Sequence, residues 1–348
     1  FATNNLTIAR NGSNIQGNAN NSTLDTNRAS VVLIYVDSTE GWLYTVENNV
    51  GDLGPPYVAA TGGTITTSGD FKIHTFTGDG TFTVTAAGNS SGSNTVDYLV
   101  IAGGGGGYDS VAGGGGGAGG YRESFPNPAT GGLSISAQAY PIQVGSGGAA
   151  STNGEPSIFS SITSAGGGSG GNYNSGGSAG GSGGGGGGTD GFPTSAGPAG
   201  AGNTPPVSPP QGNPGGSTGA VPSGQLGGSG GGGIGSAGTN SLQSGPTRGG
   251  GSSGGNGTAS SINASPVTRA GGGGGGNRSY DGPSTGPGIG GAAGPGGGGK
   301  GGGTDGTATN GTDNTGGGGG GKGFGSFSPN VVGTGGSGVV IIRYKYQN

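Results

Sequence analysis

Apolar positions gather in short, strand-sized runs near the two ends of the chain. Residues 31–36 (VVLIYV) form a continuous apolar run, which is typical of a strand buried on both faces. A turn at residues 38–41 (STEG) leads into residues 42–46 (WLYTV), so the pattern predicts a β-hairpin with Trp42 in its core. Upstream, the turn dipeptide Asn11-Gly12 separates two further short apolar segments and predicts another hairpin.

A second group of strands follows a linker that begins with residues 51–56 (GDLGPP). Residues 71–76 (FKIHTF) and 81–85 (TFTVT) predict two strands joined by Gly78-Asp79-Gly80. The second of these strands alternates threonine with apolar side chains, so one of its faces is expected to be packed and the other wet. Residues 96–101 (VDYLVI) predict one more strand, which runs into the first glycine block.

The far end of the chain carries the counterpart of that strand. Residues 338–346 (GVVIIRYKY) predict a strand, and we expect it to lie beside residues 98–101. The glycine-rich region between them would then be one large insertion closed by a strand pair, which is tolerable because loop-closure cost grows only with the logarithm of length. Three segments inside the insertion (133–136, 141–144 and 157–163) are expected to extend the base sheet, and strands nearly vanish between residues 166 and 336.

Composition changes this picture, because 102 of the 348 residues are glycine and only 26% have side chains suited to a dry core. Residues 1–102 hold 12 glycines, whereas residues 103–337 hold 89 in 235 positions. Collagen is excluded, because the glycines come in blocks and not at every third position. A membrane-spanning helix is excluded because the longest apolar runs are strand-sized.

Ordering so many glycines costs roughly 100 kcal/mol of backbone entropy, at about 1–2 kcal/mol each, and side-chain burial cannot offset that. Backbone hydrogen bonding between segments can offset this entropy cost. A glycine run in the polyproline-II conformation has three residues per turn and directs every N–H and C=O outward. We therefore expect an all-β protein with a polyglycine-II helix bundle, whose non-glycine inserts form loops at the bundle ends.

The composition shifts predict four regions. They are an N-terminal β-module at residues 1–54, a β-strand base at 55–102, the glycine-rich bundle with distal loops at 103–337, and a closing C-terminal strand at 338–348.

The net charge and the absence of cysteine exclude several classes of function. The net charge is −4 and only 7% of residues are charged, so the chain lacks the excess of basic residues with which proteins bind nucleic acid or an anionic membrane. The absence of cysteine removes disulfides, thiolate metal sites and cysteine catalysis. The sequence also lacks methionine, so we expect a processed or partial product, and no signal peptide is visible.

Motifs for chemistry are weak. GxGxxG matches carry no information in polyglycine, and the two Gly-Lys-Gly sites lack the Ser or Thr of a phosphate loop. Residues 185–192 fit a single calcium-type nonapeptide repeat without a tandem copy. His74, the single histidine, is expected to be a structural or solvated strand residue, and the carboxylates show no pairing typical of a glycosidase. We expect no cofactor, no metal and no enzymatic activity.

The remaining candidates are large aromatic or charged residues that stand among glycines. A large side chain would force glycine helices apart, so these residues are expected at edges or tips of the bundle. Aromatic faces beside arginine and amide donors suit sugars or protein loops, although the same residues could merely cap the bundle or pack subunits together. The candidate receptor-binding residues are Tyr108, Tyr173, Phe192, Arg248, Arg278, Tyr280, Asp281 and Phe324.

Four segments together carry a resemblance to a known family. Residues 71–84 (FKIHTFTGDGTFTV), 96–103 (VDYLVIAG), 118–122 (AGGYR) and 335–344 (GGSGVVIIRY) resemble the glycine-rich C-terminal domain of phage tail fibres, especially those of marine phages. Residues 1–54 look like a short β-module found upstream in such fibres. The predicted bundle is similar to the glycine-helix sandwich of tail-fibre-tip adhesins, from which the proline-rich residues 192–222 depart.

This resemblance implies a non-enzymatic fibre protein of the virion, extracellular, whose distal loops bind a host-surface glycan or outer-membrane protein. It also implies a homotrimer and contacts with other virion proteins. Two alternatives stay open. An ice-binding or matrix protein would show regularly spaced threonines on one face, and an enzyme that trims surface polysaccharide would release glycan.

Overall fold

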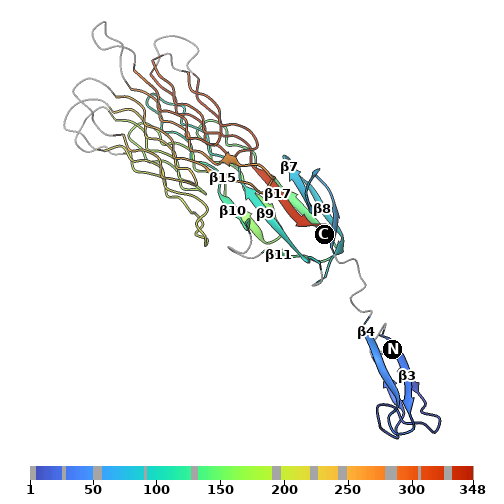
Figure 1. Cartoon of the computed structure of the whole chain (residues 1–348). Coiled ribbons are helices and arrows are strands. Elements are labelled where there is room, and N and C mark those ends of the chain that lie inside the picture. Colours follow the sequence, from blue (N-terminus) through green and yellow to red (C-terminus); the bar gives the residue numbers. More distant parts are fainter. Residues whose placement is uncertain are drawn as a thin grey trace.

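The computed structural model describes residues 5–25, 29–49, 57–89, 92–126, 132–189, 197–219, 226–241, 249–278, 288–304, 307–324 and 331–347. All regular secondary structure in these ranges is β-strand, arranged in several small sheets, and none of these ranges contains an α-helix (Figure 1).

The N-terminal module contains two strand pairs. β3 (Ala29–Asp37) and β4 (Gly41–Asn49) form the hairpin predicted from the apolar runs. β1 (Leu6–Ile8) pairs with β2 (Ser22–Leu24) and not with the residues directly after the Asn11-Gly12 turn, so the hairpin predicted there is wrong. The turn forms, with Ser13 N–H donating to the Arg10 carbonyl, but it leads into a longer loop.

The prediction that β3 is buried on both faces is also wrong. Val32, Ile34 and Val36 are 48%, 51% and 53% exposed, and Trp42, expected in the core, is 40% exposed. The reason is the size of the sheet: β3 and β4 form a two-stranded sheet, which a bridge between Ile15 and Trp42 joins to the preceding loop, so the two strands present more apolar surface than the described part of the module covers. The Trp42 indole instead packs edge-on against Tyr35, with ring centroids 5.4 Å apart.

Two sheets form the base of the glycine-rich region. The first has the order β10-β9-β17-β7-β6 with β11 also pairing β9, and the second has the order β14-β13-β12-β8-β5. The strands of the first sheet are β6 (Thr64–Ser68), β7 (Phe71–Phe76), β9 (Thr95–Ile101), β10 (Tyr121–Glu123), β11 (Leu133–Ser134) and β17 (Val339–Lys345). Those of the second are β5 (Val58–Thr61), β8 (Gly80–Ala87), β12 (Ala139–Gln143), β13 (Ser157–Phe159) and β14 (Ile162–Ser164).

The closing strand lies where the sequence predicts it. β17 pairs antiparallel with β9, with Val340 opposite Val100 and Ile342 opposite Tyr98, and on its other side it pairs with β7. The glycine-rich region is therefore an insertion between two adjacent strands of one sheet. The segments expected to extend a single base sheet divide instead: β11 joins the first sheet and β12 to β14 join the second.

The two strands predicted on either side of Gly78-Asp79-Gly80 are present, and they do not pair with each other, because β7 and β8 belong to different sheets. The connection crosses from one sheet to the other, and both strands contribute to the core between them. Phe76, Phe82, Val84 and residues of β9 and β17 are buried in that core. As expected, β8 alternates between buried apolar and more exposed positions.

Beyond the base, glycine segments run side by side and extend away from the two sheets (Figure 1). Within the described part of the insertion after β14, the one strand pair is the small hairpin β15 (Thr258–Ser260) and β16 (Val267–Arg269). Most residues of segments 102–107, 112–120 and 271–277 are buried. Their burial is achieved without large side chains, so the packing in this region is backbone against backbone.

The hydrogen bonds of these segments repeat every three residues. In segment 103–108, consecutive N–H groups donate to three different segments, and the fourth returns to the first: Gly103 and Gly106 to 152–155, Gly104 and Gly107 to 333–336, Gly105 and Tyr108 to 114–117. Its carbonyls accept from three further segments, 148–151, 167–170 and 319–322. Each interior segment is thus bonded on all sides to its neighbours, as the requirement that buried peptide groups be paired demands.

Close approach explains why glycine is needed. A Cβ at Gly116 would lie 2.0 Å from the Gly105 oxygen, and one at Gly231 would lie 2.0 Å from the Gly116 oxygen. No real Cβ makes such a contact, so these Cα atoms face carbonyl oxygens of adjacent segments directly, and Cα–H···O contacts add to the N–H···O bonds. The described interior is therefore held by peptide groups.

Candidate functional site

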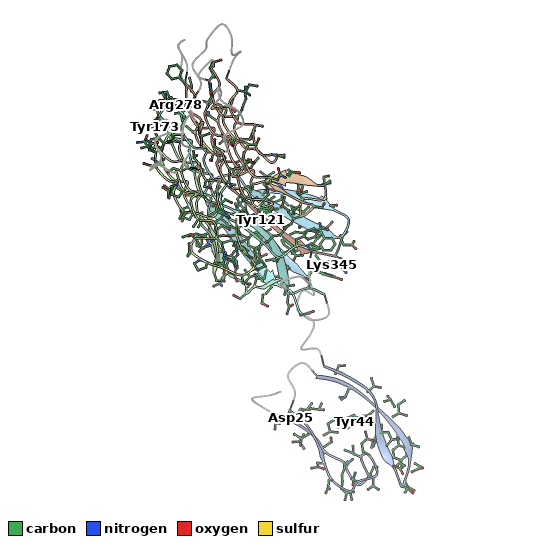
Figure 2. All side chains as sticks on the ribbon, turned by 90° about the vertical axis from the view of Figure 1, so that its left-hand side faces the viewer. Asp25, Tyr44, Tyr121, Tyr173, Arg278 and Lys345 are labelled. Atoms are coloured by element: carbon green, nitrogen blue, oxygen red, sulfur yellow. The ribbon has the colours of Figure 1, made fainter. Side chains whose placement is uncertain are left out.

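The end of the bundle farthest from the sheets carries a cluster of polar and aromatic side chains, which we call the distal cluster: Tyr108, Asp109, Ser110, Ser151, Tyr173, Arg278, Lys322 and Phe324. Tyr173 and Arg278 lie at this end, and Lys345 of the base lies at the other (Figure 2). Asp109, Ser110, Ser151 and Tyr173 lie in turns or bends, and Arg278, Lys322 and Phe324 lie at or near the ends of described glycine segments, where the backbone leaves room for large side chains.

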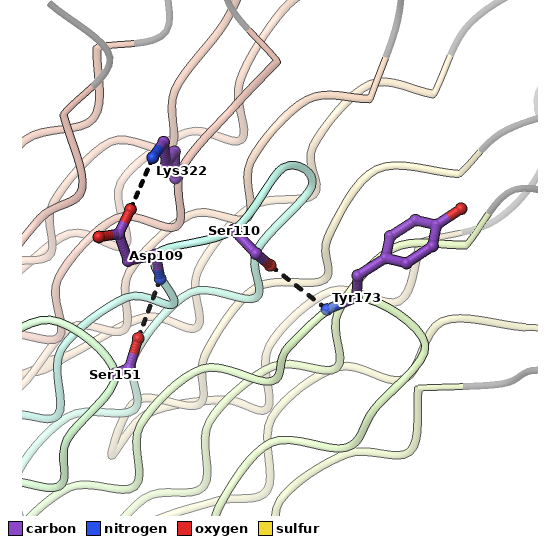
Figure 3. A network of polar contacts seen from close by, with 5 residues as sticks. All are labelled: Asp109, Ser110, Ser151, Tyr173 and Lys322. Atoms are coloured by element: carbon purple, nitrogen blue, oxygen red, sulfur yellow. Dashed lines mark hydrogen bonds and ion pairs between the residues drawn. The ribbon is translucent and has the colours of Figure 1, made fainter.

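An ion pair fastens one side of the distal cluster. Lys322 Nζ lies 2.7 Å from Asp109 Oδ1, and the Asp109 N–H donates to Ser151 Oγ at 3.0 Å (Figure 3). The Asp109 side chain is 50% exposed, so the pair faces solvent. A solvent-screened pair of this kind orients both groups and contributes little to stability.

An aromatic and a cation meet on the other side. The Arg278 guanidinium carbon lies 4.9 Å from the centroid of the Tyr173 ring, and its Nη2 donates to the Tyr173 hydroxyl at 3.5 Å. The Tyr173 N–H donates to Ser110 Oγ at 3.4 Å, which ties this pair to the turn that carries Asp109 (Figure 3). Both side chains are half-buried, so the ring and the guanidinium form a fixed, partly exposed platform.

Four of the candidate residues predicted from sequence are in this cluster. The Tyr108 carbonyl accepts from Lys322 N–H at 3.1 Å, and Phe324 N–H donates at 2.9 Å to the carbonyl of Asn277, which precedes Arg278 in the chain. The structure therefore brings Tyr108, Tyr173, Arg278 and Phe324 onto adjoining segments. The other four, Phe192, Arg248, Tyr280 and Asp281, lie outside the described residues.

The sequence predicted no partner for Lys322. This lysine pairs with a residue 213 positions away, and no local pattern signals such a pairing. The one signal for Asp109 in the sequence was its position directly after Tyr108, a candidate receptor-binding residue.

A second polar cluster lies where the base meets the bundle. Tyr121 OH donates to Glu123 Oε2 at 2.6 Å, and Ser260 Oγ donates to Glu123 Oε1. Burial raises the pKa of Glu123, while its hydrogen bonds from Ser260 and Tyr121 and the charge of Arg269 oppose that rise. Because both carboxyl oxygens are engaged, this cluster fastens the β15–β16 hairpin to β10 and is not arranged as a catalytic acid.

His74 is a structural residue, as the sequence predicts. It is fully buried, its Nδ1 donates to the Gly62 carbonyl at 2.7 Å, and its Nε2 accepts from Tyr344 OH at 3.0 Å. Burial lowers its pKa, so the ring is neutral and fixed in one tautomer by these two bonds. Burial also raises the pKa of Tyr344 to about 12.

The described residues contain no group of three or more His, Asp or Glu side chains placed to hold a metal ion. The calcium-type repeat at residues 185–192 lies partly outside the described ranges. No helix in the described ranges is long and apolar enough to cross a bilayer.

A known family model matches most of the chain. The family model of the glycine-rich domain matches residues 75–345, which is 271 of the 348 residues. The chain belongs to this glycine-rich domain family. The match begins within β7 and ends at the last residue of β17, so the glycine-rich domain comprises the insertion together with the strands that close it. No curated protein and no solved structure matches the chain.

Proposed function

We propose that this glycine-rich domain protein is a non-enzymatic virion fibre protein of a phage, that its interior segments are polyglycine-II helices, and that its distal cluster contacts the host surface. The observation that carries the proposal is the position of the Tyr173–Arg278 platform at the end of the bundle opposite the base (Figure 2). An attachment protein needs a stiff support with recognition side chains at its far end.

The hydrogen-bond geometry supports the helical assignment. A polyglycine-II helix has three residues per turn, so its N–H groups should face three neighbours in rotation. Segment 113–119 behaves as segment 103–108 does: its N–H groups donate to 316–322, 165–171 and 229–232, and its carbonyls accept from 273–276, 182–185 and 105–108. Six surrounding segments correspond to hexagonal packing, which makes the support stiff in every lateral direction.

The chemistry of the distal cluster favours a glycan or an outer-membrane protein loop as the receptor. An aromatic face stacks on sugar rings or apolar side chains, while Arg278 and Lys322 offer donors to hydroxyl and carboxylate groups. Each contact is weak, and several copies in a trimer and several fibres on a virion would multiply them. A homotrimer, other virion proteins as partners and an extracellular location are part of the same proposal.

The test is adsorption. Fluorescently labelled protein should bind cells of a susceptible bacterial strain and block phage adsorption, and the double variant Tyr173→Ala, Arg278→Ala should lose most of this binding. The matched control is Lys72→Ala, Tyr346→Ala, which removes a cation–aromatic pair of the same kind, 4.9 Å apart, at the base. Equal loss with both variants, or none with either, would refute the distal assignment. Release of sugar from host polysaccharide would refute the non-enzymatic one.

A further inference from the structure

A groove runs along the outer edge of the base beside β10, and Arg122 lies at its centre. Arg122 is paired with Val100 of β9. Its neighbours Tyr121 and Glu123 also line the first hollow described below, where both Glu123 carboxyl oxygens already accept hydrogen bonds, from Tyr121 and Ser260. Two hollows of about 390 Å³ and about 460 Å³ open along this edge, and Arg122 lines both. The two hollows therefore adjoin at Arg122, and we call them together the groove.

The outer wall of the groove is the proline-rich insert 203–211. Pro209 and Pro210, with Ser208, line the first hollow opposite Tyr98, and Pro205 and Val207 line the second opposite Thr163. The walls thus alternate apolar ring surfaces with hydroxyl groups. Volumes in this range are typical of small-molecule sites.

Side-chain hydrogen bonds hold this wall in place. Gln211 is 1% exposed; its Nε2 donates to the Pro205 carbonyl and its Oε1 accepts from Ala165 N–H, both at 2.8 Å. Asn203 Oδ1 accepts from the N–H groups of Val207 and Gln211 at 3.1 and 3.2 Å. The groove is therefore preformed, and a ligand would not have to order it.

Arg122 differs from two other arginines of the chain, one in the base and one in the distal cluster. The guanidinium of Arg343 stacks on Phe71 and Phe125, and that of Arg278 stacks on Tyr173. The Arg122 side chain makes no hydrogen bond, ion pair or ring contact with any described residue, although it is only half-exposed. A planar guanidinium in this position is suited to bind a carboxylate through two parallel hydrogen bonds.

We propose that this lateral groove binds a carboxylate-bearing saccharide, with the sugar carboxylate on Arg122. A sugar acid has the three properties that the groove complements: an anionic group for Arg122, apolar C–H faces for the proline rings, and hydroxyls for Ser208 and Thr163. A neutral sugar would leave Arg122 without an anionic partner, and an acidic peptide would lack the flat C–H ring faces that the proline rings complement. This inference does not depend on the distal cluster, because the groove lies on the flank of the base.

Isothermal titration tests the groove directly, using tetragalacturonate as the acidic probe, a galactose tetrasaccharide as the neutral one and poly-glutamate as the acidic peptide. Tetragalacturonate should bind, with an affinity at least tenfold above both other probes and falling as salt is added. Arg122→Gln should reduce that affinity at least tenfold, and Arg122→Lys, which retains the charge without the bidentate geometry, should reduce it less. Arg10→Gln, which removes an arginine charge from the N-terminal module, is the control and should leave it unchanged.

Three outcomes would overturn the proposal. These are absence of tetragalacturonate binding, equal binding of the neutral tetrasaccharide or poly-glutamate, and full affinity in Arg122→Gln. A melting temperature for Arg122→Gln equal to that of the wild type establishes that any loss of binding is local. Because adsorption to cells is not measured, this result and that of the distal variants are independent of each other.

Discussion

The substitution Gly116→Ala tests whether peptide groups hold the bundle together. The added Cβ would lie 2.0 Å from the Gly105 oxygen, whereas ordinary contact begins at 3.4 Å, so segment 103–108 must move by about 1.4 Å, the difference. Two bonds join that segment to segment 113–119: Gly105 N–H to the Gly117 carbonyl at 2.8 Å and Tyr108 N–H to the Gly114 carbonyl at 3.1 Å. A shift of this size breaks both.

Each buried donor left without a partner costs about 1–3 kcal/mol, so the expected destabilisation is about 3 kcal/mol or more. For a region of this size that lowers the melting temperature by about 6–12 °C. Scanning calorimetry measures the shift, and hydrogen exchange read by mass spectrometry should show faster exchange in peptides from residues 103–120.

Gly250→Ala is the matched control, because the nearest atom to its Cβ would be the Ile289 oxygen at 3.6 Å. There the alanine should be neutral or stabilise by up to about 1 kcal/mol, through the lower entropy of the unfolded chain. The two substitutions are chemically identical and should act in opposite directions. A Gly116→Ala protein with the melting temperature and exchange rates of the wild type would refute the close-packed backbone interior.

Three further predictions concern single side chains. His74 is neutral when folded and its pKa is lowered, so the unfolded chain takes up a proton first as pH falls below about 6.5; stability should drop by up to about 1.4 kcal/mol per pH unit between pH 6.5 and 5. His74→Gln should abolish this slope in denaturant titrations, and a slope that persists would contradict it. Ser157→Ala should lower the free energy of unfolding by about 2 kcal/mol, because the buried Ser157 hydroxyl accepts from one backbone N–H and donates to one backbone carbonyl, each at 2.8 Å. Thermal unfolding measures the loss, and Ser157→Thr is the variant that retains the hydroxyl. Equal melting temperatures for Ser157→Ala and the wild type would count against this prediction. Lys322→Ala should change stability by less than about 1 kcal/mol, because the Asp109 partner is half-exposed, and a melting temperature lowered by more than 5 °C would show that this pair is structural.

The closing strand could be predicted because its signal is strong and local. Residues 339–342 are four consecutive β-branched apolar residues after a long glycine region, and the apolar segment of β9 directly precedes that region. Two such strands on either side of one insertion have an obvious partner in each other. The bonding of glycine segments was likewise predictable, since chains without side chains have only peptide groups with which to cohere.

The assignment of strands to sheets could not be read from the sequence. A short Gly-Asp-Gly connection is compatible both with a hairpin and with a crossing between two sheets, and the choice depends on partners far along the chain: β7 takes β17, and β8 takes β12. The exposure of Trp42 could not be predicted either, because a hydrophobic pattern shows which residues are apolar and not how much surface is available to cover them.

The types of residue in the candidate site could be predicted from the sequence, but which of these residues contact one another could not. Tyr173 and Arg278 were chosen because a bundle that excludes side chains must place large residues at its ends. Their contact spans 105 positions, and glycine and serine make up 56 of the 104 residues between them. Such segments carry no side-chain pattern that fixes their order in the bundle, so neighbours at the tip cannot be deduced before the packing is known.

A backbone-bonded interior also separates stability from recognition. Where each glycine segment is satisfied by its neighbours, a side chain on a distal turn contributes almost nothing to cohesion, and its replacement leaves the bundle intact. Tyr173→Ala and Arg278→Ala proteins should therefore unfold within about 2 °C of the wild type, since surface substitutions away from the core stay within about 0.5 kcal/mol. A much larger loss would mean that the tip is part of the packing, and the binding defect of those variants would then have to be attributed to unfolding and not to the loss of receptor contacts.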